Sequence, residues 1–214
     1  MKQLSYSEFI VGVLLPEDNN RQTDVVLKRL RAQLSHADGI RGFMVIYLTT
    51  TTTKATPAAL LTVLREIIDD RLWQSTDTSA PTIEKLKNNR DELISLACMN
   101  VIMPTGMVTI HEDPELSKQS LFTSKNAIGL LKEVCNSLDN NNDSSSNKDH
   151  NCKNLIDEQL NAIIAAASLP SSSLSAENSG NSESVLYWVE FMKKWKYNEQ
   201  QKNDISIAVQ SILH

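Results

Sequence analysis

The sequence contains few of the features that identify a biochemical function. Its three cysteines, Cys98, Cys135 and Cys152, form neither a CxxC pair nor the Cys/His spacing of a zinc site. An odd number of cysteines suits a reducing compartment, so we expect free thiols and no disulfide. No segment reaches the roughly 20 apolar residues that cross a bilayer, and the apolar run at 9–15 is short for a signal peptide. We therefore expect a soluble intracellular protein, cytoplasmic or within an organelle.

Charge and catalytic motifs are equally uninformative. The net charge of −5 is mild, and lysine and arginine do not cluster as they do in a nucleic-acid-binding face, which argues against DNA or RNA as a partner. The sequence has no GxSxG, HExxH or GxGxxG motif and no phosphate-binding loop. These absences predict neither a catalytic residue nor a cofactor, and they favour a non-enzymatic protein.

Helical patterning is what the sequence does contain. Apolar residues recur every three or four positions after four starts that carry capping residues or proline: Thr23, Thr56–Pro57, Pro81 and Asp113–Pro114. We expect Gly39 to end the first of these helices. Pro104 and Gly106 are expected to interrupt or kink the third, since proline removes a backbone donor from a helix.

Two apolar runs, residues 9–15 and 43–48, are ambiguous because both are rich in β-branched residues. They also fit the helical spacing i, i+3, i+4, i+7, which we favour. The sequence thus predicts an all-α fold, either an irregular helical bundle or a short α-solenoid, with a tethered C-terminal helical tail. The alternative is an α/β fold with a small parallel sheet formed by residues 9–15 and 43–48.

Two polar segments divide the chain. Residues 139–151 and 169–183 are rich in asparagine and serine and too poor in apolar residues to offset the entropy of ordering, so we interpret them as flexible loops. We expect a main helical domain over residues 1–138, one helix at 152–168, and aromatic and terminal helices at 184–214 that dock on the main domain.

The most distinctive segment is the aromatic helix near the C-terminus. Five of the eleven aromatic residues fall between Tyr187 and Tyr197, and an amphipathic helix would gather the apolar ones on one face. We favour docking of this face on the protein's own core. The main alternative is a partner-binding surface formed by Trp188, Phe191, Met192 and Trp195, and contact with a membrane surface is less favoured because the tail is acidic.

A second candidate site follows the methionines at intervals of four. Met103, Met107 and His111 would share one stripe of a continuous helix, next to Glu112. Thioethers and imidazole suit a soft metal such as Cu(I), and an imidazole beside carboxylates suits acid–base chemistry. We favour the interpretation that the methionines fill an adaptable core and that Asp113 caps a helix.

Two functional hypotheses follow. The first is a non-enzymatic protein–protein interaction or scaffold protein, whose partner the sequence does not identify. The alternative is a small-molecule or metal-binding protein or an enzyme, with a pocket near Met103, Met107, His111 and Glu112.

Overall fold

The computed structural model describes six parts of the chain: residues 23–34, 37–50, 58–68, 83–139, 149–169 and 182–214. Eight helices and no strand lie within these ranges. The helices are α2 (Thr23–Gln33), α3 (Ala37–Thr50), α4 (Ala58–Ile68), α5 (Ile83–Val108), α6 (Pro114–Asp139), α7 (Asp149–Ser168), α8 (Glu183–Lys194) and α9 (Glu199–Leu213).

The predicted all-α fold is confirmed. Residues 43–48 lie within α3, so the alternative parallel sheet is wrong at this segment. Residues 9–15, the other half of that alternative, fall outside the described residues. The helical spacing of the apolar side chains decided the structure of the segment, although its β-branched residues favour a strand.

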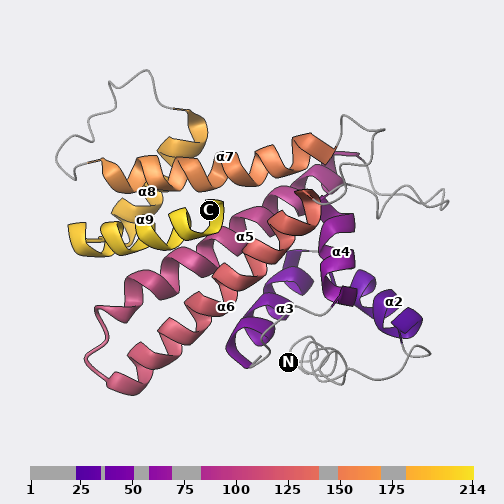
Figure 1. The fold of residues 1–214 in the computed structure, drawn as a ribbon, viewed down its shortest axis with the longest axis horizontal. Coiled ribbons are helices and arrows are strands. Elements are labelled where there is room, and N and C mark those ends of the chain that lie inside the picture. Colours follow the sequence, from indigo (N-terminus) through magenta and orange to yellow (C-terminus); the bar gives the residue numbers. More distant parts are fainter. Residues whose placement is uncertain (1–22, 35–36, 51–57, 69–82, 140–148, 170–181) are drawn as a thin grey trace.

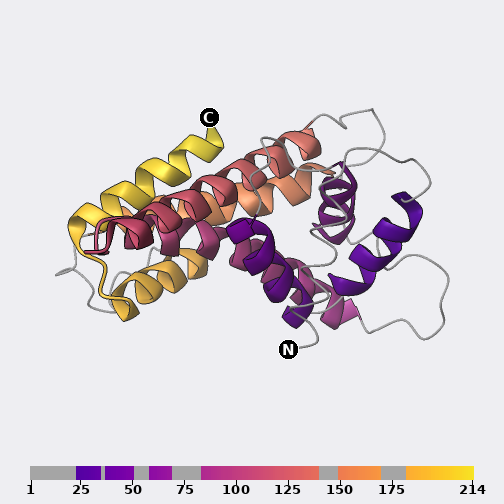
Figure 2. The ribbon, with the colours of Figure 1, turned by 90° about the horizontal axis from the view of Figure 1, so that it is seen from below.

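The helices α5 and α6 form an antiparallel pair through the middle of the molecule (Figure 1). The N-terminal helices α2, α3 and α4 gather near one end of this pair, and α8 and α9 lie toward the other end, as both views show (Figures 1 and 2). Helix α7 contacts α5 and α6, and it also contacts α8 and α9. Helix α8 packs mainly on α7, whereas α9 packs on α5, α6 and α7.

A single cluster of buried apolar residues joins these helices. It begins at Leu30 in α2 and ends at Ile212 in α9, and each described helix contributes to it. Burial of such side chains is the main favourable term in folding, at about 25 cal/mol per Å² of apolar surface. The C-terminal helices therefore share the core of the preceding helices.

Side chains from other helices satisfy the carbonyls at several helix C-termini. The last four carbonyls of a helix have no partner within it, and leaving them buried and unpaired is costly. Asn126 Nδ2 donates to Leu48 O near the end of α3 at 2.9 Å. Gln201 Nε2 donates to Gly106 O near the end of α5 at 2.7 Å. These hydrogen bonds hold the C-terminal end of one helix against the side of another helix.

The predicted end of the first helix at Gly39 is wrong, and the third helix is not interrupted at Pro104. Helix α2 ends at Gln33, and Gly39 lies in the first turn of α3, where its carbonyl accepts a hydrogen bond from Gln33 Nε2. Helix α5 continues through Pro104 to Val108. The hydroxyl of Thr105 donates to Val101 O at 2.6 Å, an added hydrogen bond in the turn that lacks the proline N–H.

Candidate functional site

Helix α8 begins and ends where its local sequence directs. Ser182 is the N-cap, and its hydroxyl accepts a hydrogen bond from Val185 N. Glu183 lies in the first turn, and Lys193 and Lys194 lie in the last turn. This order of charges stabilises the helix because negative groups favour the N-terminus and positive groups the C-terminus.

Trp188 anchors α8 to α7. Its side chain is completely buried, and its Nε1 donates to Gln159 Oε1 of α7 at 2.9 Å. The neighbouring rings of Tyr187 and Phe191 meet the indole edge to face, with centroids 4.9 and 5.5 Å away. Val185, Val189 and Met192 complete the buried face of the helix. Two of the predicted partner-binding residues, Trp188 and Met192, therefore lie in the core of this chain.

The chain reverses sharply after α8. Trp195 is the C-cap, and Lys196 has a φ of 55°, the left-handed conformation common just after a helix. The amide of Tyr197 donates to Met192 O and that of Lys196 donates to Lys193 O, which is the Schellman pattern. Tyr197 is thereby turned back into the core, where it is buried.

Helix α9 is tied to this reversal through Gln201, which is 1% exposed. Asn198 caps the helix: its Oδ1 accepts from Gln201 N, and its own amide donates to Gln201 Oε1. The same Gln201 side chain donates through Nε2 to Gly106 O of α5. One residue thus completes a capping box and an interhelical contact.

Several large apolar side chains of α8 and its C-cap remain exposed. Leu186, Tyr187 and Trp195 are each about half exposed, at 48%, 47% and 49%. Phe191 is partly buried, and its ring centroid lies 6.3 Å from that of Trp195. We call Tyr187, Phe191 and Trp195 the α8 aromatic surface.

The expectation that Trp195 shares the docked face of the helix is wrong. Trp195 follows the last helical residue, Lys194, and the backbone leaves helical geometry at Lys196. Conversely, the pattern did not single out Tyr187, which lies on the α8 aromatic surface. Its signal was its position opposite the face that contains Val185 and Val189.

The second candidate site is not assembled as one stripe. Met103 and Met107 are partly buried on α5, but the helix ends at Val108 and His111 lies beyond it. His111 Nε2 lies 3.1 Å from the hydroxyl of Ser120 on α6, and Glu112 is exposed. Asp113 Oδ1 accepts from Glu115 N at the start of α6, as expected of a capping residue. Within the described residues, no group of three or more His, Cys, Asp or Glu side chains is arranged to hold a metal ion.

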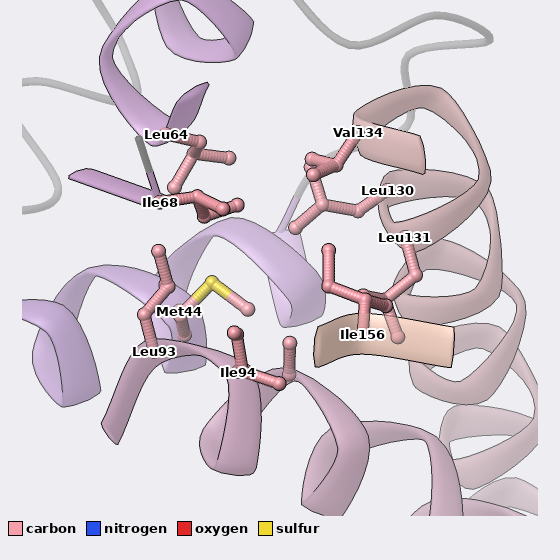
Figure 3. A pocket seen from close by; sticks show the side chains of 10 residues that line it. Met44, Leu64, Ile68, Leu93, Ile94, Leu130, Leu131, Val134 and Ile156 are labelled. Atoms are coloured by element: carbon pink, nitrogen blue, oxygen red, sulfur yellow. The ribbon is translucent and has the colours of Figure 1, made fainter. Parts of the chain in front are cut away.

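A small apolar cavity lies where α3, α4, α5, α6 and α7 meet. Figure 3 shows Met44, Leu64, Leu93, Leu130 and Ile156 pointing into it from the surrounding helices. Its volume is about 20 Å³, and every residue that lines it is apolar. Ligand pockets for drug-sized molecules measure roughly 300–1,000 Å³, so this cavity is a packing defect of the core.

Two thiols are buried between α5 and α6. Neither Cys98 nor Cys135 forms a disulfide, and burial raises the pKa of Cys98 to about 12, with a further contribution from Cys135. A thiol with a raised pKa is a poor nucleophile, so Cys98 acts as a packing residue. Cys152 belongs to α7, but its side chain lies outside the described residues.

None of the described helices combines the length and the apolar character that a membrane crossing requires. No protein-family model, no curated protein and no solved structure matches the chain.

Proposed function

We propose that this chain is a non-enzymatic protein-binding module and that the α8 aromatic surface is its binding site. The observation that carries the proposal is that Tyr187 and Trp195 are half exposed on α8 and at its C-cap, while another face of the helix is anchored in the core. Tyrosine and tryptophan are enriched at binding hot spots because they supply a large contact area at low entropic cost. A rigid helix that presents them has little ordering entropy left to lose on binding.

Charge around this surface indicates the partner. Lys193, Lys194 and Lys196 are exposed at the C-terminal end of α8, whereas the acidic Glu183 and Glu190 lie further toward its start. Lys193 pairs with Glu190 at 3.5 Å. We infer a partner helix that places apolar side chains on Tyr187 and Trp195 and acidic side chains near Lys194 and Lys196.

The test begins with a photo-crosslinking amino acid at position 187 of the full-length chain, which identifies the residue of the partner that lies against α8. The partner is then purified, and its affinity is measured for the natural chain and for the double variant Tyr187→Ser, Trp195→Ser. We expect the double variant to lose at least tenfold in affinity, because hot-spot truncations cost roughly 1–4 kcal/mol. The matched control is Ile207→Ser, since Ile207 is 58% exposed on α9.

Three outcomes would contradict this proposal. The first is unchanged affinity of the double variant for the purified partner. The second is a concentration-dependent dimer in sedimentation that the double variant abolishes, which would assign the surface to a second copy of the chain. The third is binding to vesicles of anionic lipid with no protein partner, which would assign it to a membrane surface.

A further inference from the structure

A pocket of about 260 Å³ lies beside α8, and no residue of the α8 aromatic surface lines it. It forms where the C-terminal ends of α7 and α8 meet the start of α9, and α7, α8, the α8–α9 turn and α9 all contribute to its lining. Val189 and Met192 belong to its apolar lining, together with Leu169. We call it the lysine pocket, because its charged lining residues are Lys193, Lys196 and Lys202.

The charged side chains that line the pocket are all positive. The three ammonium groups can donate hydrogen bonds but cannot accept them. No carboxylate lines the pocket, although Glu190 and Glu199 pair with Lys193 and Lys202 from outside the lining. The remaining lining is almost entirely apolar. A complementary ligand must therefore carry a negative acceptor group and an apolar portion.

Lys202 makes this a built site instead of a gathering of surface lysines. Its side chain is only 7% exposed, and its Nζ lies 3.1 Å from both Leu169 O and Glu199 Oε1. The carbonyl belongs to the C-terminal end of α7, where a cation is favourable. The ammonium group is thus fixed in position before any ligand arrives.

Lys196 occupies its position at a cost to the fold. A φ of 55° is unfavourable for a residue with a side chain, and glycine is the usual residue at this point of a Schellman turn. The turn instead places a lysine at the pocket. Strained backbone conformations are common at binding sites and active sites. The neighbouring pocket and its two other lysines support the interpretation that Lys196 belongs to a binding site.

We propose that the lysine pocket binds a small carboxylate with a short apolar chain. The carboxylate lies among Lys193, Lys196 and Lys202, and the chain covers Leu169, Val189 and Met192. The volume is slightly below the range for drug-sized ligands, which suits an acid of several carbon atoms. The pocket shares Lys196 with the proposed partner surface, but Tyr187 and Trp195 do not line it, so hexanoate binding can be measured without a partner.

The test is an NMR titration of the isotope-labelled full-length chain with hexanoate. We expect saturable shifts of the amides of Leu169, Lys196 and Tyr197, and no such shifts with hexylammonium, which has the same chain length and the opposite charge. Inorganic phosphate should bind more weakly than hexanoate because it leaves the apolar lining uncovered. A short peptide with a leucine carboxylate at its C-terminus, compared with its amide, shows whether a free acid or a chain terminus is the better source of the carboxylate.

Two variants separate binding from folding. Lys196→Gly removes one ammonium group and relieves the backbone strain, so we expect a fold that is at least as stable with about fivefold weaker binding of hexanoate. Lys194→Gln removes the same charge from α8 at a residue that does not line the pocket, and it should leave hexanoate binding unchanged.

The absence of saturable shifts with hexanoate would overturn the proposal and leave Lys202 as a cap for α7. Equal affinity for phosphate and hexanoate would also overturn it, because the apolar lining would then take no part. Equal weakening by Lys194→Gln and Lys196→Gly would show that overall charge, and not the pocket, attracts the anion.

Discussion

Two tryptophans of the same segment have opposite surroundings. Trp188 and Trp195 lie seven residues apart, which is nearly two full helical turns, so a continuous helix would place them on the same face. Trp188 is fully buried against α7, whereas Trp195 is 49% exposed. The difference arises because α8 ends at Lys194 and the chain reverses at Lys196. Helical periodicity indicates which side chains lie on the same face of a helix, but those side chains are buried only where another helix covers that face.

The largest expected effect is the contrast between the two tryptophans themselves. We expect Trp188→Ala to lower the free energy of unfolding by about 3–5 kcal/mol, because it leaves a cavity and removes the hydrogen bond to Gln159. Trp195→Ala should change the same quantity by less than about 0.5 kcal/mol. Urea unfolding followed by circular dichroism measures both, and similar losses in the two variants would break the comparison.

The next effect concerns Gln201, which ties the reversal after α8 to α5. Gln201→Leu should lower the free energy of unfolding by about 2 kcal/mol, because Gly106 O is left without this buried donor and the capping box is lost. Gln200→Leu is the matched control, since Gln200 is exposed and its amide donates only to Asp204 on the same helix. Equal losses in the two glutamine variants would mean that the interhelical contact contributes nothing.

Gly106 and Gly129 extend the comparison to positions that differ in whether another side chain lies against them. A Cβ at Gly106 would lie 3.1 Å from Cε1 of the buried Tyr197, whereas a Cβ at Gly129 would meet nothing within 4 Å. We expect Gly129→Ala to raise the free energy of unfolding by about 0.5–1 kcal/mol through helix propensity. Gly106→Ala should lower it by about 1 kcal/mol, because the crowded ring outweighs that gain. Thermal unfolding of both variants gives the signs, and a stabilising Gly106→Ala would show that Tyr197 is loosely held.

The reversal at Lys196 is strained, and we expect the fold to become more stable when this strain is removed. Lys196→Gly is expected to raise the free energy of unfolding by about 1 kcal/mol, since glycine adopts a φ of 55° without penalty. Chemical denaturation of this variant beside Lys194→Gly provides the check. The second substitution should destabilise the end of α8, where helical geometry is required.

The smallest effect is a dependence on alkaline pH. Burial raises the pKa of Tyr197 from 10.0 to about 12, so the folded chain holds its phenolic proton to higher pH than the unfolded chain does. The resulting contribution to stability is fully present below pH 10 and is lost as the pH rises toward 12. Unfolding measured between pH 9 and 11 should show a shallower decline for Tyr197→Phe than for the natural chain. Identical declines would show that Tyr197 is not held in the core as described.

Much of the fold follows from local sequence. The start of α6 at Asp113–Pro114 was predicted from capping chemistry, and Asp113 Oδ1 indeed accepts from Glu115 N. The end of α5 was not predicted, because a neighbouring helix can compensate for a proline such as Pro104 within a helix. The Thr105 hydroxyl, for example, lies 2.6 Å from the hydroxyl of Ser124 on α6. Such compensation depends on residues far away in the chain and leaves no local pattern.

The candidate surface was predicted only in outline. The clustering of aromatic residues between 187 and 197 identified the segment, but its four proposed contact residues divide between core and surface. The lysine pocket had no signature in the sequence, since Leu169 and Lys202 are 33 positions apart in the chain. Neither feature can be found without knowing which helix ends meet.

The sequence by itself determined that this protein is built of amphipathic helices, that two of them begin at Thr23 and Pro114, and that the aromatic segment near the C-terminus forms such a helix. These properties depend on interactions within a few residues of each other, which the chain encodes directly. The tertiary structure alone decided that Trp188 meets α7, that Trp195 faces outward, and that three lysines surround one pocket. Those outcomes depend on the packing of helices that are distant in the sequence, and periodicity carries no information about which neighbour a face will meet.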